Sequence, residues 1–208
     1  MKELIKKIIP LKIIDYRISL INEKSYKKWL KDGPLIPTHP VAKQKLLLEY
    51  KQKYNLNTLI ETGTCYGHTI DALKRNFQKI ISIEISQSLF ELAKQKFKNI
   101  KNISLFLGDS GEMLPTILKD IQEPCLFWLD GHYSDGPTSK GELNTPIFKE
   151  IDAVYKSRTD HVILIDDARL FNGEDDYPTL ENFKTFLMKH NPKVNLTIKD
   201  DIIIITNR

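Results

Sequence analysis

The sequence predicts an α/β fold with a mostly parallel, doubly wound sheet, and three observations lead to this prediction. Short apolar runs recur along the chain, stretches of helical period separate them, and several runs end in an acidic residue. Such a sheet gathers the carboxyl ends of its strands at one edge, where ligands bind. The expected strands are residues 58–60, 80–84, 103–107, 125–129 and 162–165, followed by a closing hairpin of 194–198 and 202–206.

Two glycines follow the first expected strand, in the turn before a helix predicted over residues 67–77. A glycine lets the backbone approach a ligand closely, and the free N–H groups at the start of a helix favour a carboxylate or phosphate. Gly63 and Gly67 are four residues apart and Glu61 precedes them, which departs from the three-glycine pattern of dinucleotide sites. An acid there would repel a pyrophosphate, but it suits a cofactor that carries an amino acid with its ammonium group.

Acidic residues also end the second and third expected strands. Glu84 lies about twenty residues beyond the glycines, where a carboxylate can accept hydrogen bonds from ribose hydroxyls. Asp109 follows the run 103–107. Each acid alone is more often a solvated strand end, and the glycine pair alone is often a plain turn. Their occurrence at successive strand ends favours a cofactor site.

These residues resemble the class I S-adenosylmethionine-dependent methyltransferases, whose first motif is acid-x-G-x-x-x-G and whose second strand ends in the acid that binds ribose. In that family an acid at the position of Asp109 caps the adenine amino group. The resemblance implies a Rossmann-like methyltransferase fold with seven strands, a terminal antiparallel strand and helices on both faces. It implies S-adenosylmethionine as the cofactor, bound by Glu61, Gly63, Thr64, Gly67, His68, Thr69, Glu84, Ile85, Asp109, Ser110 and Asp130.

A second group of acids follows the fourth and fifth expected strands. Asp130 ends one run and the pair Asp166-Asp167 ends the next, with an amphipathic crossover helix predicted over 142–155 between them. The three carboxylates should therefore converge and repel one another unless a cation compensates them. Aspartate oxygens are ligands that Mg²⁺ selects, and a metal there could lower the pKa of an acceptor hydroxyl. Alternatively, the pair caps a turn and Asp130 only orients the cofactor.

This group resembles the metal-dependent sugar O-methyltransferases of the macrocin type over roughly residues 59–172. In that group a strand-end Asp and a following Asp-Asp pair bind Mg²⁺, matching Asp130, Asp166 and Asp167. The sequence departs from that group in the loop 130–133, which leaves the acceptor open. The catalytic candidates are Asp130 and His132, a histidine whose ordinary pKa suits a base, although an exposed loop histidine is the commoner outcome. Arg169 could pair with Asp166 or bind an anionic acceptor.

Length and charge indicate one core with a basic front segment. The chain has 208 residues, 41% of them apolar, so we expect a helical extension with a Pro-rich connector over 1–40 and one catalytic domain over 41–208. Residues 1–54 contain 13 Lys/Arg and 5 Asp/Glu, against 18 and 22 in the rest. The basic, apolar segment 1–14 could pack on the domain or on a second copy in a homodimer, or contact an anionic membrane surface. Its lysines and Pro10 exclude a spanning helix, and no signal peptide is recognisable.

Composition also excludes several functions. Two cysteines, Cys65 and Cys125, predict no disulfide and a cytoplasmic protein, and neither zinc spacing nor a nucleophile elbow occurs. Lysine-rich helix faces lack interleaved aromatics, so no nucleic-acid partner is expected. The prediction is an S-adenosylmethionine-dependent O-methyltransferase that acts on a hydroxyl of a small, sugar-like acceptor with Mg²⁺. The alternatives are a non-catalytic binding protein of the same fold and a metal-independent methyltransferase.

Overall fold

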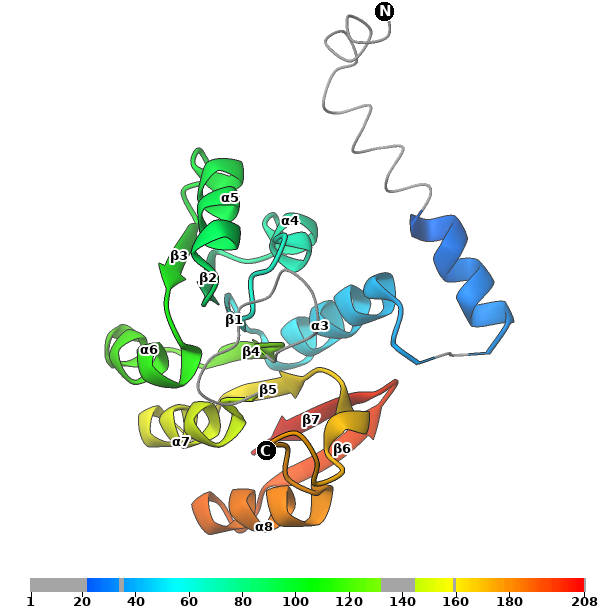
Figure 1. Cartoon of the computed structure of the whole chain (residues 1–208), viewed down its shortest axis with the longest axis vertical. Coiled ribbons are helices and arrows are strands. Elements are labelled where there is room, and N and C mark those ends of the chain that lie inside the picture. The colour runs from blue at the N-terminus through cyan, green and yellow to red at the C-terminus, as the bar shows by residue number, and fades with distance from the viewer. Residues whose placement is uncertain (1–21, 34–35, 132–144, 159, 208) are drawn as a thin grey trace, which may run out of the picture.

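A single mixed sheet organises the molecule (Figure 1). The computed structural model describes residues 22–33, 36–131, 145–158 and 160–207. The seven strands lie in the order β3-β2-β1-β4-β5-β7-β6, and helices cover both faces. All neighbouring strands from β3 to β5 are parallel, and β7 is antiparallel to both of its neighbours, β5 and β6. The predicted seven-stranded, mostly parallel sheet is therefore confirmed.

The strands coincide closely with the apolar runs of the sequence. Their bounds are β1 Thr58–Thr62, β2 Lys79–Glu84, β3 Ile103–Leu107, β4 Cys125–Leu129, β5 Val162–Ile165, β6 Asn195–Lys199 and β7 Ile202–Thr206. β1, β4, β5 and β7 are buried along their whole length, because helices cover both faces of the sheet there. A two-residue turn joins β6 to β7, with positive φ at Asp200 and Asp201, as the twist of a tight hairpin requires.

The helices complete two apolar layers. Their bounds are α3 Pro40–Tyr54, α4 His68–Leu73, α5 Gln87–Phe97, α6 Ser110–Ile117, α7 Ile147–Ser157 and α8 Leu180–His190, with short 3-10 turns η1 Leu118–Asp120 and η2 Ala168–Leu170. One core joins α6, α7 and α8 to the face that carries Ile60 and Phe127, and the other joins α3, α4 and α5 to the face that carries Leu59 and Trp128. A fully buried aliphatic side chain contributes about 1.5–3 kcal/mol, so both layers stabilise the sheet strongly.

Two helices are shorter than the sequence predicts. α4 ends at Leu73 instead of continuing to Phe77, which packs separately into the core. The crossover helix α7 begins at Ile147 after Pro146, whereas the prediction began it at residue 142. Residues 142–144 lie outside the described part of the chain. A proline is well tolerated where a helix starts, so Pro146 is a natural boundary.

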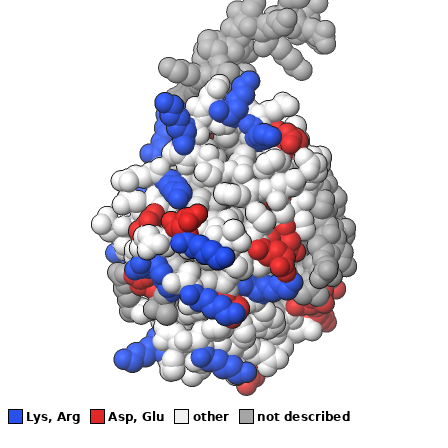
Figure 2. Space-filling view, turned by 90° about the vertical axis from the view of Figure 1, so that its left-hand side faces the viewer, with Lys and Arg blue, Asp and Glu red and all other residues white. Residues whose placement is uncertain are grey.

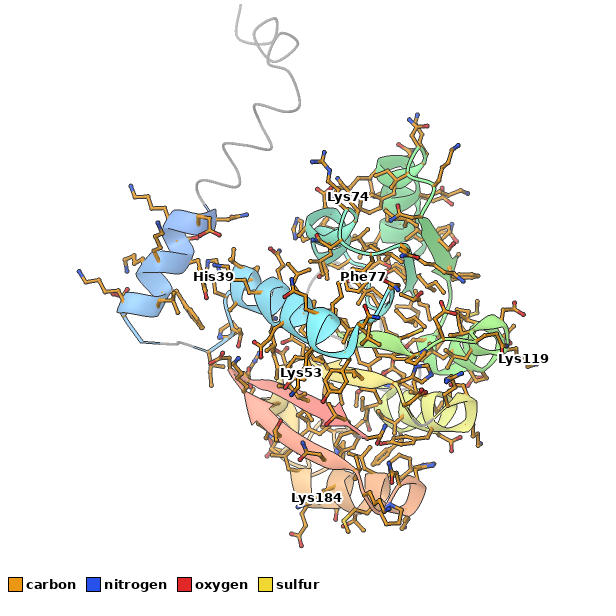
Figure 3. The ribbon with its side chains drawn as sticks, turned by 180° about the vertical axis from the view of Figure 1, so that it is seen from behind. His39, Lys53, Lys74, Phe77, Lys119 and Lys184 are labelled. Atoms are coloured by element: carbon orange, nitrogen blue, oxygen red, sulfur yellow. The ribbon has the colours of Figure 1, made fainter. Side chains whose placement is uncertain are left out.

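A separate helix over residues 22–31 precedes the sheet and stands apart from it in Figure 1. His39, which caps the start of α3, lies between this helix and α3 in Figure 3. The His39 ring centroid is 5.6 Å from that of Tyr26 and 6.2 Å from that of Trp29. The predicted division into 1–40 and 41–208 stays a prediction. Among the described residues, none of the helices has both the length and the apolar character that crossing a bilayer requires.

Candidate functional site

The parallel register gathers acidic residues at one edge of the sheet. Thr62 of β1 is level with Ile83 of β2 and with Leu129 of β4, which is level with Ile165 of β5. The residues that follow these partners, Glu84, Asp130 and Asp166, therefore stand in one row with Gly63, the residue that follows Thr62. The predicted convergence of strand-end acids on a common edge is observed.

The glycine turn after β1 makes close contacts with neighbouring segments. Gly63 has φ +83°, and a Cβ added there would lie 2.3 Å from the carbonyl oxygen of Asp130. Gly67 has φ +67°, and its Cβ would lie 2.6 Å from the ring of Phe97. Both positions favour glycine for two reasons: the backbone is left-handed, and a Cβ would be too close to a neighbouring group. The turn therefore brings the β1 loop directly against the loop that follows β4.

Two backbone N–H groups hold the Glu84 carboxylate. Its Oε2 accepts a hydrogen bond of 2.7 Å from the N–H of Cys65, and its Oε1 accepts one of 2.8 Å from the N–H of Ser86. The side chain is buried at the end of β2. A carboxylate offers about four acceptor positions, so these two bonds orient it while leaving capacity for two hydroxyl donors. Ile85, the next residue, is 37% exposed at the same edge.

The Glu61 carboxyl of the edge is strongly perturbed by its burial. It is buried in β1 and accepts a hydrogen bond of 2.7 Å from Ser82, whose oxygen lies 2.6 Å from that of Thr64. Burial raises the pKa of Glu61 to about 8, while hydrogen bonds from Ser82 and Thr69 oppose the rise. A nearby cation, such as an ammonium group, would lower this pKa and favour the charged form.

Asp109 acts as the N-cap of α6. Its Oδ1 accepts a hydrogen bond of 2.8 Å from the N–H of Gly111, and it stands at the end of β3 as predicted. The neighbouring Ser110 is buried and donates to Glu150 of α7 at 2.6 Å. This contact turns the Ser110 hydroxyl toward α7. His68 begins α4 as an exposed residue, with its ring 5.9 Å from that of Tyr66.

The acid pair after β5, Asp166 and Asp167, forms ion pairs with two basic side chains. Lys43 of α3 forms an ion pair with Oδ2 of Asp166, whose Oδ1 accepts the N–H of Asp167 at 3.0 Å. Arg169 bridges Asp167, at 2.6 Å, and Asp201 of the β6–β7 turn. The predicted contact between Arg169 and Asp166 is therefore wrong, because the left-handed backbone of Asp167 turns its own carboxylate toward the guanidinium.

Lys43 is the main positive charge at the end of β4 and β5. Its ammonium lies 5.9 Å from the centre of the Trp128 ring, and its side chain is 21% exposed. Burial by itself would lower the pKa of Lys43, but Asp166, Asp130 and Asp167 outweigh burial and raise it. Lys43 is therefore charged at any physiological pH.

The predicted metal ligands do not form a metal cluster here. Among the described residues, no group of three His, Cys, Asp or Glu side chains is arranged to hold a metal ion. Asp166 and Asp167 are engaged by Lys43 and Arg169, so the donor set does not fit Mg²⁺ without rearrangement. His132, the predicted base, lies outside the described residues.

Comparison with known proteins identifies solved structures with a similar fold. No family model matches the chain. The O-methyltransferase TomG of Streptomyces achromogenes, solved with S-adenosylmethionine, superimposes with a TM-score of 0.58 at 19% identity, over 88% of this chain and 87% of that one. An O-methyltransferase of Bacillus cereus with S-adenosylhomocysteine gives 0.58 at 18% identity, over 88% of both chains. The Podospora anserina methyltransferase PaMTH1 gives 0.57 at 14%, over 96% and 97%.

The chain has the Rossmann-like methyltransferase fold. A curated relative, ribosomal RNA small subunit methyltransferase A of Caldanaerobacter subterraneus subsp. tengcongensis, is 29% identical over 90 residues. That match covers 43% of this chain and 30% of the relative, so the chain spans under a third of the protein it matches.

The sequence does not predict three residues that lie at this edge of the sheet: Lys43, Ser82 and Asp201. Lys43 lies three and four residues before the buried Leu46 and Leu47, so helical spacing places it on the inner face of α3. Ser82 interrupts an apolar strand directly opposite Glu61, which signals a buried partner. The sequence indicates only that Asp201 lies in a turn. Its contact with Arg169 spans 32 positions and is not visible in the local pattern.

A separate groove of about 660 Å³ lies between α6 and α7. Its lining includes Pro115, Leu118 and Ala153 with the charged side chains Lys119, Lys149 and Arg158. None of the predicted cofactor or metal residues lines it. This groove is therefore distinct from the acidic edge.

Proposed function

We propose that the chain transfers a methyl group from S-adenosylmethionine to a hydroxyl of a small polar acceptor. The observation that carries this proposal is the arrangement of Glu84 beside the glycine turn. An oriented carboxylate with spare acceptor capacity stands next to a turn whose glycines pack it closely against the Asp130 carbonyl and the Phe97 ring. A ribose with its two hydroxyls and an amino-acid moiety match these two features.

Each end of the cofactor has candidate partners at the edge. Glu84 accepts hydrogen bonds from the ribose hydroxyls, Asp109 accepts one from the adenine amino group, and exposed Ile85 packs on the adenine ring. The turn from Gly63 to Gly67, with Thr64, receives the methionine end. Glu61, with Thr69, supplies negative charge for the ammonium group. His68, Ser110 and Asp130 remain predicted cofactor contacts.

The chain's own residues contribute mainly by alignment. Well-oriented reactants can gain about 7–11 kcal/mol from proximity alone, and methyl transfer needs donor and acceptor in line. In this proposal the sulfur–methyl bond breaks as the oxygen–methyl bond forms, and the acceptor proton passes to a base, for which Asp130 and His132 are the predicted candidates. The O-methyltransferase neighbours TomG and that of Bacillus cereus support an oxygen acceptor.

The finer acceptor assignment comes from sequence resemblance. A sugar-like acceptor follows from the likeness to the macrocin-type enzymes. Magnesium assistance is the less favoured form of the proposal, because Lys43 and Arg169 already engage the acid pair. A bound metal would polarise an acceptor hydroxyl. A cytoplasmic location remains a prediction, consistent with the free thiols of Cys65 and Cys125.

An RNA acceptor is the rival that the partial relative suggests. Figure 2 shows lysine, arginine, aspartate and glutamate side chains interspersed over the side on which α6 and α7 lie. Lys149 pairs there with Glu112 at 2.7 Å, and Lys156 pairs with Asp152 at 2.6 Å. Nucleic-acid binding usually needs a field of one sign, so this face does not support an RNA acceptor.

Calorimetric titration tests the cofactor part of the proposal. S-adenosylhomocysteine should bind the full chain, whereas NAD should not, because Glu61 and the four-residue glycine spacing disfavour a pyrophosphate. Absence of S-adenosylhomocysteine binding would refute the proposal.

An acceptor panel then tests transfer. Sugars, nucleotide sugars, catechols and small-subunit ribosomal RNA are each incubated with S-adenosylmethionine, and S-adenosylhomocysteine release is measured. Release with a small hydroxyl compound supports the proposal, release with RNA supports the rival, and cofactor binding without any turnover supports a non-catalytic protein. Homodimerisation and membrane contact through residues 1–14, which lie outside the described residues, stay separate predictions.

A further inference from the structure

The acidic end of β4 and β5 already contains a cation within the chain. Asp130, Asp166 and Asp167 all act electrostatically on Lys43, and Asp166 forms the direct ion pair. Arg169 provides a second positive charge on the far side of Asp167. The two basic groups therefore offset part of the negative charge of these carboxylates.

The position of Lys43 is fixed by packing as well as by charge. It projects from α3 with Leu46 and Leu47 buried one turn further along the helix, and its ammonium lies near the face of Trp128. Asp166 is buried, with its side chain only 2% exposed. A buried carboxylate without a cation is costly, so this pair is maintained in the folded chain.

A divalent ion would have to displace these contacts. Mg²⁺ requires near-octahedral oxygen ligands at short distance. Both oxygens of Asp166 are engaged, one by Lys43 and one by the N–H of Asp167, and one oxygen of Asp167 is engaged by Arg169. An ion entering between them would also meet the ammonium and guanidinium groups at close range.

We propose that Lys43 is the resident cation of this edge and occupies the place that a divalent metal would take, so that the native chain binds no Mg²⁺ there. If the chain has the proposed function, an acceptor oxygen bound at this edge lies near the Lys43 ammonium group and not near a metal. The inference itself concerns cation binding and does not depend on methyl transfer.

Metal titration of matched variants tests this inference. Mg²⁺ and Mn²⁺ are added to the full-length wild type, Lys43→Met and Lys45→Met at constant ionic strength, with thermal unfolding and calorimetry as readouts. Lys45 lies two residues along α3 and is 53% exposed, so it controls for the loss of a lysine from this helix. The wild type and Lys45→Met should show no saturable metal effect.

Lys43→Met should behave differently in two ways. Its melting temperature should fall by on the order of 10 °C, because an uncompensated buried carboxylate remains. Saturating Mg²⁺ should then restore about 5 °C, because the vacated position accepts the ion. Lys43→Arg, which retains the charge, should stay insensitive to Mg²⁺.

Two results would overturn the inference. Saturable Mg²⁺ or Mn²⁺ binding to the wild type would show that Lys43 does not occupy the metal position, and this measurement decides the question even if Lys43→Met fails to fold. A folded Lys43→Met that ignores Mg²⁺ would show that lysine and metal do not share one place. Neither result depends on S-adenosylhomocysteine binding, so failure of the proposed function is recognised separately.

Discussion

The β1–β3 half and the β4–β5 half of the acidic edge hold their carboxylates in different ways. In the β1–β3 half, Glu61, Glu84 and Asp109 accept hydrogen bonds from neutral donors, a serine hydroxyl or backbone N–H groups. In the β4–β5 half, Asp166 and Asp167 face the charged side chains of Lys43 and Arg169. The same residue types at equivalent strand ends therefore have different electrostatic partners.

This difference separates two kinds of chemistry on one edge. Neutral donors orient a carboxyl group without a fixed countercharge. Glu84 can therefore still bind hydroxyls, and Glu61, whose pKa is raised, can still ionise beside an ammonium group. A carboxylate already paired with a cation gains less from a further positive ligand. The comparison therefore predicts cofactor binding in the first half and internal charge compensation in the second.

The largest effect is expected at Gly63, where the two halves meet. Gly63→Ala introduces a Cβ that would clash with the Asp130 carbonyl, and the free energy of unfolding should fall by about 3 kcal/mol from combined overpacking and backbone strain. Gly33→Ala is the matched control, because Gly33 has φ +86° but no atom of the described residues within 4 Å of its added Cβ. It should cost only about 1 kcal/mol in urea unfolding. Equal losses would show that the two loops do not approach closely.

Glu84→Gln tests ligand binding in the β1–β3 half. Affinity for S-adenosylhomocysteine should fall by about 100-fold, because charged acceptors give stronger hydrogen bonds to hydroxyls than neutral ones. Glu112→Gln serves as the control, since that carboxylate is 67% exposed on α6. Calorimetry measures both, and an unchanged dissociation constant for Glu84→Gln would place the ribose elsewhere.

The buried carboxyl of Glu61 should make stability depend on pH. Its folded pKa is raised from an ordinary 4.5 to about 8, so the folded state binds more protons between these values. Stability from this group is fully present below about pH 4.5 and is lost as pH rises toward 8. Glu61→Gln mimics the protonated form, so its advantage over the wild type should grow across that range as the wild type loses stability. Parallel pH profiles in urea unfolding would contradict the raised pKa.

The smallest effect is expected at the N-cap of α6. Asp109→Ala removes the acceptor for the Gly111 N–H and should cost about 1 kcal/mol of stability, whereas Asp109→Asn should cost little, because asparagine caps equally well. Thermal unfolding compares the two variants. If both lose the same stability, the cap contributes through its charge and not through its geometry.

The sequence predicts the frame of this edge well because strand ends and glycines are local signals. β3, β4 and β5 match the apolar runs 103–107, 125–129 and 162–165, and parallel pairing then aligns the acids that follow them. The methyltransferase fold and the position of Glu84 beside the glycine turn follow from the same local pattern.

The sequence does not predict the ion-pair partners of these residues, because the partners come from distant positions in the chain. Lys43 precedes Asp166 by 123 residues, so helical spacing can place it on the inner face of α3 but cannot identify its partner. The bridge from Arg169 to Asp201 depends on the β6–β7 turn reaching the same edge. Without these contacts, three converging aspartates predict a metal site. With them, Lys43 and Arg169 already supply cations to Asp166 and Asp167.

A structure of the full chain with S-adenosylhomocysteine and Mg²⁺ tests the contrast between the two halves most directly. The account predicts the ribose hydroxyls on Glu84, the amino-acid end against the turn at Gly63, and Lys43 still paired with Asp166 with no metal beside it. A ligand bound away from Glu84, or a magnesium ion coordinated by Asp166 and Asp167, would contradict it.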